Sequence, residues 1–155
     1  KFNKSMSKLC SPYVIFLFAF ISGFGFANQA ESVFPQIQIK VKQQVYPLEY
    51  ADTFERRAQG LMHREDMCDS CGMLFNFQQT RRVGMWMKNT LIPLDVAFVR
   101  SDGKITDIKA MQPHDLTSTT SSEQVLYAWE MNQGWFAKNA IKVGDMVVIP
   151  FNNKP

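Results

Sequence analysis

Residues 94–109 read Leu94-Asp95-Val96-Ala97-Phe98-Val99-Arg100-Ser101-Asp102-Gly103-Lys104-Ile105-Thr106-Asp107-Ile108-Lys109, and this stretch decides the fold class. Residues 94–100 form a strongly apolar run with β-branched and aromatic side chains. Residues 101–104 have the composition of a tight turn, and residues 105–109 form the return strand. The stretch therefore predicts a β-hairpin in a domain built mainly from strands.

Similar signals recur on both sides of this hairpin. Ile37, Ile39 and Val41 alternate with polar residues, as in a half-buried strand. We expect further strands at about 45–50, 73–77, 83–87, 125–131 and 146–149. About eight short strands with one or two small helices predict a mainly β fold, a compact barrel-like or sandwich domain with its core at about 37–149.

Two short helices are expected within this β framework. Asp52-Thr53-Phe54-Glu55 resembles a capping box, and a helix should follow through Arg57 to about Leu61. At helical spacing, its buried face would comprise Phe54, Ala58, Leu61 and Met62. A second short helix or turn is expected at 135–140. The Ser/Thr-rich stretch 113–123 predicts a long loop, either mobile or a lid over a site.

The N-terminus has the pattern of a secretory signal peptide. Lys1, Lys4 and Lys8 precede an unbroken apolar run over residues 13–26, followed by small residues at Ala27 and Ala30. We predict a signal peptide over residues 1–27, with cleavage after Ala27 or Ala30, and export of residues 28–155 to the periplasm or cell exterior. An uncleaved anchor is the alternative, but the run is short for a membrane span. After cleavage, no stable membrane insertion is expected.

Removal of that segment changes the charge balance. The chain has 17 Lys and Arg against 14 Asp and Glu, and three of the lysines but none of the acids precede Asn28. The predicted mature domain therefore has 14 basic and 14 acidic residues. A neutral domain gives no compositional reason to expect nucleic acid or an anionic membrane as a partner.

Two cysteines remain after cleavage, Cys68 and Cys71, in a short acidic loop. In an oxidising compartment such a pair forms a short-loop disulfide. A redox or metal-binding role is the alternative, but Asp66 and Asp69 disfavour the thiolate that either role requires. We therefore favour a structural disulfide.

Residues 83–95 contain the densest polar chemistry of the chain. Lys88, Asn89 and Thr90 place a cation, an amide and a hydroxyl side by side. With other polar residues they form a candidate site for a small polar or anionic ligand, or for another exported protein. The predicted ligand-binding residues are Arg57, Arg64, Trp86, Lys88, Asn89, Thr90, Asp95 and Glu130. On this hypothesis Lys88→Ala weakens ligand binding and leaves stability almost unchanged.

An internal network of ion pairs explains the same residues without a ligand. In this alternative, Arg57 or Arg64 pairs with Asp95 or Glu130, because buried charges persist only when they are paired. Residue composition does not separate the two interpretations, and both stay open at this stage.

Two further functions have candidate residues. A soft-metal site for copper would use Met85, Met87 and His63, since thioethers select Cu(I). A periplasmic hydrolase would use Asp95 and Glu130 as paired carboxylates. The sequence has no nucleophile elbow and no helical pair of histidines, so we predict no cofactor and do not favour an enzyme.

Five ordered motifs carry a family resemblance over residues 37–149. They are Arg57-Ala58-Gln59-Gly60-Leu61-Met62-His63-Arg64, Gly72-Met73-Leu74-Phe75, Trp86 to Asp95, Tyr127-Ala128-Trp129-Glu130 and Gly144-Asp145. The chain resembles small exported bacterial and archaeal proteins known as domain of unknown function 192. The resemblance implies a compact, mainly β, barrel-like domain behind a signal peptide, with no agreed substrate. The Cys68–Cys71 loop departs from that pattern, which favours a local disulfide over a catalytic centre.

Overall fold

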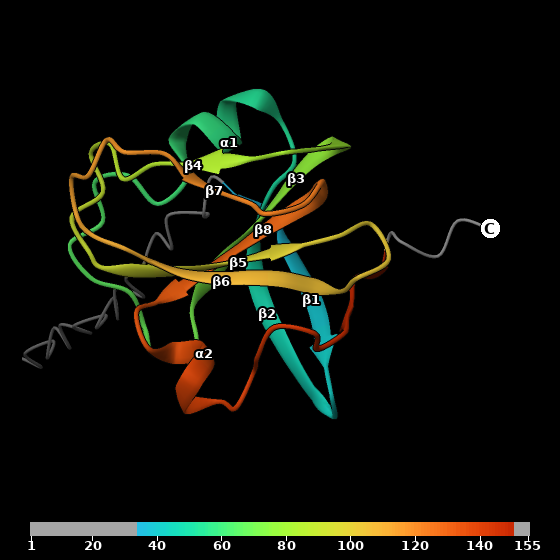
Figure 1. Ribbon diagram of the computed structural model, residues 1–155. Coiled ribbons are helices and arrows are strands. Elements are labelled where there is room, and N and C mark those ends of the chain that lie inside the picture. Colours follow the sequence, from blue (N-terminus) through green and yellow to red (C-terminus); the bar gives the residue numbers. More distant parts are fainter. Residues whose placement is uncertain (1–33, 151–155) are drawn as a thin grey trace, which may run out of the picture. The chain divides into compact units, whose positions relative to one another are not determined.

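The computed structural model describes residues 34–150, so the predicted signal peptide lies outside the described residues. As expected, the described part is a mainly β single domain, with a seven-stranded sheet curled into a half-barrel and two short helices (Figure 1). Its strands are β1 (Gln36–Val41), β2 (Gln44–Ala51), β3 (Gly72–Arg81), β4 (Gly84–Met85), β5 (Leu94–Val99), β6 (Ile105–Met111), β7 (Thr119–Thr120), β8 (Val125–Asn132) and β9 (Val147–Val148). The helices are α1 (Phe54–Gln59) and α2 (Trp135–Lys138). Within the described residues, neither helix is long and apolar enough to cross a membrane.

The strand order in the large sheet is β6-β5-β8-β3-β2-β1-β9. Neighbouring strands are antiparallel except β2 and β3, which are parallel and therefore need a long connection. That connection carries α1 and the cysteine loop. An isolated bridge between Lys104 and Met146 draws the two edges of the sheet together at one end.

The hairpin predicted at residues 94–109 is present. β5 and β6 pair from Leu94 opposite Met111 to Val99 opposite Ile105. In the turn, the Asp102 carboxylate accepts the backbone N–H of Lys104 at 3.1 Å. Gly103 has φ of +90°, which is why this position favours glycine.

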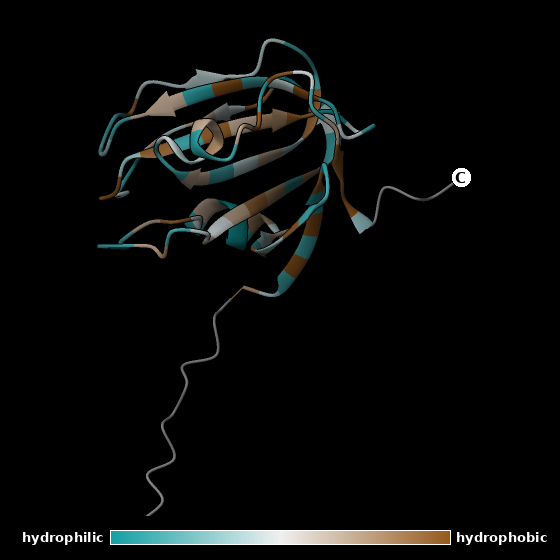
Figure 2. Cartoon of the chain, turned by 90° about the horizontal axis from the view of Figure 1, so that it is seen from below, coloured by the Kyte–Doolittle hydropathy of each residue, from teal (hydrophilic) through white to brown (hydrophobic). Residues whose placement is uncertain are grey.

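Apolar side chains cover both faces of the large sheet, and the alternating hydrophobic bands are visible in Figure 2. One face packs against α2, and we call it the α2-side core. It includes Ile39, Leu74, Tyr127, Trp129, Met131, Trp135 and Phe136. The other face, the pocket-side core, includes Met73, Phe75, Met85, Met87, Leu94, Val96 and Phe98. The ring centroids of Trp129 and Phe136 lie 4.9 Å apart at 84°, an edge-to-face contact.

Two predicted elements differ from the structure around residues 83–123. The strand expected at 83–87 is only two residues long, β4, because it pairs with an equally short strand, β7. β7 lies inside the predicted loop 113–123, so β4 fixes part of that loop. The loop also accepts a hydrogen bond at its Ser121 hydroxyl, from the backbone N–H of Val83 at 3.0 Å.

The predicted buried face of the first helix is wrong. Thr53 caps α1 by accepting the Arg56 N–H at 3.2 Å, and the helix ends at Gln59 because Gly60 adopts φ of +48°. Leu61 is buried but lies beyond this break, so it does not follow the helical spacing. Phe54 is 75% exposed.

The disulfide predicted between Cys68 and Cys71 is present in the structure. The side-chain amide of Asn132, at the end of β8, donates to the Met67 carbonyl at 3.2 Å and to the Cys68 carbonyl at 3.0 Å. The disulfide loop is therefore held against the end of β8, an interior strand of the sheet.

Gly72→Ala should destabilise the domain. A Cβ at Gly72 would lie 2.3 Å from the Glu130 carbonyl oxygen, which belongs to the backbone of the interior strand β8 and has no room to move. We expect a loss of about 1–3 kcal/mol in the free energy of unfolding, measured by urea denaturation. Gly84→Ala is the control, because its Cβ would meet only the rotatable Ser118 hydroxyl. Equal losses in both variants would contradict this account.

Candidate functional site

A pocket opens at the pocket-side core, between the C-terminal turn of α1, the strands β3 and β8, and β4. Its enclosed space is small, about 30 Å³. This is room for a few water-sized groups, so the pocket suits one functional group at the end of a ligand. The lining residues are Arg57, Ala58, Gln59, Gly60, Leu61, Met62, Phe75, Met85, Trp86, Thr90 and Glu130.

Glu130 is the acidic residue of this lining and comes from the interior strand β8. On β8 it lies between Val96 of β5 and Met73 of β3, both fully buried apolar residues. Its side chain is 4% exposed, and no hydrogen bond or ion pair joins its carboxyl to the residues that the structure describes. This burial raises the pKa of Glu130 to about 8.

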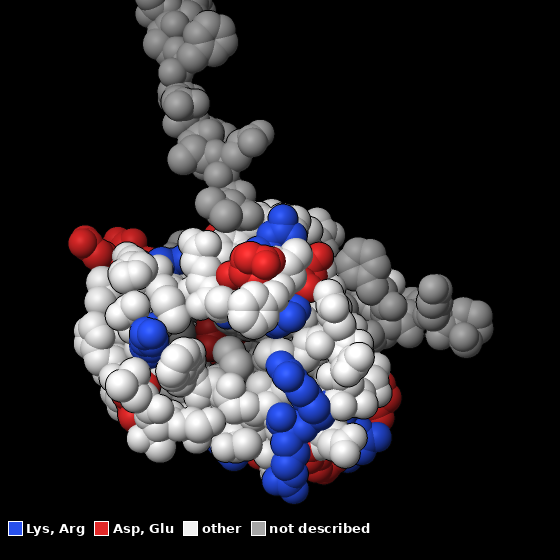
Figure 3. Space-filling view, turned by 90° about the horizontal axis from the view of Figure 1, so that it is seen from above, with Lys and Arg blue, Asp and Glu red and all other residues white. Residues whose placement is uncertain are grey.

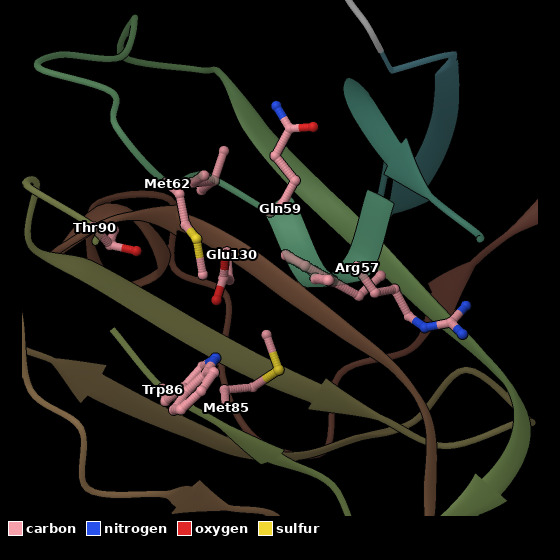
Figure 4. A pocket seen from close by; sticks show the side chains of 11 residues that line it. Arg57, Gln59, Met62, Met85, Trp86, Thr90 and Glu130 are labelled. Atoms are coloured by element: carbon pink, nitrogen blue, oxygen red, sulfur yellow. The ribbon is translucent and has the colours of Figure 1, made fainter. Parts of the chain in front are cut away.

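The surroundings of the Glu130 carboxyl are apolar and soft. Figure 4 shows the thioethers of Met62 and Met85 on opposite walls, with the Trp86 indole beside Met85. Trp86 is 52% exposed and stands at the mouth. Figure 3, which views this face from above, shows acidic atoms recessed in a hollow among uncharged atoms.

The polar run Lys88-Asn89-Thr90 is divided between the pocket and the solvent. Thr90 is buried and lines the pocket, with its hydroxyl donating to the Lys88 carbonyl at 3.3 Å. Asn89 is an exposed turn residue with φ of +54°. Lys88 is exposed and does not line the pocket; its Nζ lies 5.4 Å from the centroid of the Trp86 ring, a cation–π contact.

Neither predicted arginine directs its charge into the pocket. The Arg57 guanidinium donates to the carbonyls of Asp52 and Asn76, each at 2.8 Å, and Figure 4 shows it pointing away from Glu130. Arg64 forms an ion pair with Glu49, away from the lining residues. The structure thus contains none of the ion pairs of these arginines with Asp95 or Glu130 that the alternative interpretation required.

Asp95 and Glu130 lie on opposite faces of the sheet. Asp95 lies two residues before Ala97 on β5 and therefore shares its face, which belongs to the α2-side core. The Asp95 carboxylate accepts the Gly134 N–H at 2.7 Å. Glu130 pairs with Val96 and faces the pocket-side core. The two carboxylates therefore do not flank one cavity, and this arrangement gives no support to the paired-carboxylate hydrolase.

The three residues considered for copper are also separated. Met87 is buried in the pocket-side core, whereas His63 is exposed and does not line the pocket. Met85 shares the pocket with Met62 instead. Among residues 34–150, no group of three or more His, Cys, Asp or Glu is placed to hold a metal ion.

Sequence reasoning missed part of the lining, above all Gln59, Phe75 and Met62 as neighbours of Glu130. Met62 was predicted as part of the buried face of the first helix. Its position depends on the helix break at Gly60, which turns the following residues toward β8. No periodic pattern signals such a turn.

The raised pKa of Glu130 predicts how the stability of the folded protein changes with pH. Folding favours the protonated acid, so stability should fall as pH rises from the ordinary pKa of 4.5 to about 8, and stay level above that. At 1.4 kcal/mol per pKa unit, the rise from 4.5 to about 8 corresponds to a loss of about 5 kcal/mol. Glu130→Gln should match the parent protein at pH 5 and exceed its stability at pH 9, as measured by guanidinium unfolding.

Among the described residues, the other groups with shifted pKa values affect stability outside the range from pH 4.5 to 8. Five described acids have pKa values lowered by hydrogen bonds and therefore affect stability below about pH 4: Glu55, Asp102, Asp107, Asp115 and Asp145. Burial raises the pKa of Tyr127 to about 12, which acts only at high pH. If the free energy of unfolding changed with pH in the same way in the parent and in Glu130→Gln, ionisation of Glu130 would cost no stability, and this prediction would be wrong.

Two solved structures are similar to this chain. One, from Sinorhizobium meliloti 1021, is described as a candidate transcription regulator; it is 35% identical with a TM-score of 0.72, and the match covers 75% of this chain and 95% of that one. The other, from Novosphingobium aromaticivorans DSM 12444, has unknown function; it is 32% identical with a TM-score of 0.72, covering 76% and 88%. A search of curated proteins finds no significant match. The family model for DUF192, described as "Uncharacterized ACR", matches residues 37–149, and the chain belongs to this family.

Proposed function

We propose that this domain binds a small polar ligand in the pocket between α1, β4 and β8, with the Glu130 carboxyl as the recognising group. The observation that carries the proposal is a buried carboxyl at the floor of an open cavity, without a partner among the residues that the structure describes. A ligand that offers Glu130 a hydrogen-bond donor supplies the partner that the described residues do not.

The charges around the pocket favour a neutral or cationic ligand over an anionic one. Arg57 uses its guanidinium on two backbone carbonyls, and Lys88 lies outside the lining. An anion in the pocket would meet Glu130 without a compensating positive charge. Of the predicted ligand-binding residues, we retain Trp86, Thr90 and Glu130 as ligand contacts.

We also propose that the domain works outside the cytoplasm. The N-terminal pattern of residues 1–27 and the disulfide between Cys68 and Cys71 both support an oxidising compartment. A nucleic-acid partner has little support, because residues 28–155 have as many acidic as basic residues. The exposed side chains of Phe54, Trp86 and Leu116 keep a protein partner as the second candidate.

A thermal-shift screen of the purified protein tests the proposal. The panel contains sugars, amines, alcohols and small carboxylates, because these differ in charge and in hydrogen-bond donors. A ligand at 100 times its dissociation constant should add about 2.7 kcal/mol of stability. We expect at least one neutral or cationic compound to stabilise the protein and to lose this effect in Glu130→Gln.

Lys88→Ala is the matched control for this screen. Lys88 is exposed and outside the pocket, so the variant should fold normally and keep the response to a neutral or cationic ligand. A response only to anions, lost in Lys88→Ala, would instead favour the polar surface around residues 88–90. No response to any compound, or responses unchanged in Glu130→Gln, would contradict the proposed function.

A further inference from the structure

We propose that the pocket binds an organic ammonium ion, with its nitrogen at the Glu130 carboxylate and its apolar substituent against Phe75, Met62 and Met85. This inference rests on the proposed function and names the ligand class for the same site. It follows from the charge of the pocket and from the character of its walls.

The charge of the pocket favours a cation. Among its lining residues, Arg57 and Glu130 are ionisable, and of these two only Glu130 has a charged group without a partner in the part of the chain that the structure describes. The neighbouring elements contribute Phe75 and Met73 from β3, Met85 from β4, Trp86 directly after β4, and Val96 from β5, none of which titrates as an acid or a base. A buried carboxylate becomes favourable when an opposite charge accompanies it.

The walls favour a cation with carbon substituents. Leu61, Met62, Phe75 and Met85 are apolar, and thioether and aromatic groups pack well against methylene and methyl groups. The face of the Trp86 ring already attracts a cation, because Lys88 Nζ lies over it. Aromatic faces also bind ammonium ligands elsewhere in proteins.

A hard metal ion does not fit the same walls. Ca²⁺ and Mg²⁺ need six or more oxygen ligands, and the lining provides one carboxyl and few other side-chain oxygens. A soft ion such as Ag⁺ remains a chemical competitor, since two thioethers line the pocket.

The test uses n-butylammonium and its neutral counterpart 1-butanol, with affinities measured by isothermal titration calorimetry. At pH 7 the parent protein should bind the ammonium ion at least about tenfold more tightly than the alcohol, which corresponds to one ion-pair contribution of about 1.4 kcal/mol. Glu130→Gln should remove this preference. Lys88→Ala, at an exposed residue outside the pocket lining, should keep it.

Proton release gives a second readout that needs no variant. The free carboxyl is largely protonated at pH 7, because its pKa is about 8, and must ionise when it pairs with the ligand. Titrations in two buffers with different ionisation heats should therefore show the release of close to one proton per ligand. Affinity should rise with pH up to about 8 and then level off, because the amine keeps its own charge to about pH 10.

Several outcomes would overturn the inference. Equal affinities for 1-butanol and n-butylammonium, with both lost in Glu130→Gln, would leave the proposed function standing but remove the ammonium ligand class. Stabilisation by Ag⁺ alone, lost in Met62→Leu and Met85→Leu, would replace the ammonium with a soft metal. Ammonium binding that persists in Glu130→Gln and releases no proton would place the ion elsewhere on the protein.

Discussion

The position of strand β8 constrains the rest of this structure. It lies between β5 and β3 and is covered on both faces, so successive side chains enter two different cores. Tyr127, Trp129 and Met131 pack toward α2, and Ala128 and Glu130 face the pocket side. A strand buried on both faces reads as a nearly continuous apolar run. The acid at position 130 is the exception to that run.

The buried acid opposes folding and is kept neutral by its surroundings. Val96 and Met73 flank Glu130 across the sheet, and neither can hydrogen-bond to its carboxyl. Burial rather than a charged neighbour therefore controls its pKa. Perturbed acids in cavities are common at functional sites, and the open pocket above Glu130 gives this acid access to a ligand.

The pocket depends on two short elements that regular packing would not require. The break at Gly60 ends α1 early and brings Leu61 and Met62 to the wall. The β4–β7 pair holds Met85 and Trp86 opposite them. Membership in DUF192 and the likeness to two solved structures establish the fold without naming a ligand. The chemistry of the site must therefore be argued from these residues.

Local patterns in the sequence were sufficient for the fold class. The alternation at Ile37, Ile39 and Val41 and the turn at Asp102-Gly103 depend on contacts within a few residues, and the corresponding strands and hairpin are present. The disulfide also followed from two cysteines three residues apart. Glu130 stood out because an acid within an apolar strand needs either a partner or a function.

Only the tertiary structure decided how the polar residues are grouped. A side-chain period of two places Asp95 and Glu130 on opposite faces only once β5 and β8 have a known register. The parallel pairing of β2 with β3 and the direction of each arginine likewise depend on contacts between distant segments. The sequence by itself determined a β domain with an anomalous buried acid. The three-dimensional packing determined that this acid lies under an open pocket and has no partner within residues 34–150, because long-range register leaves no local signal.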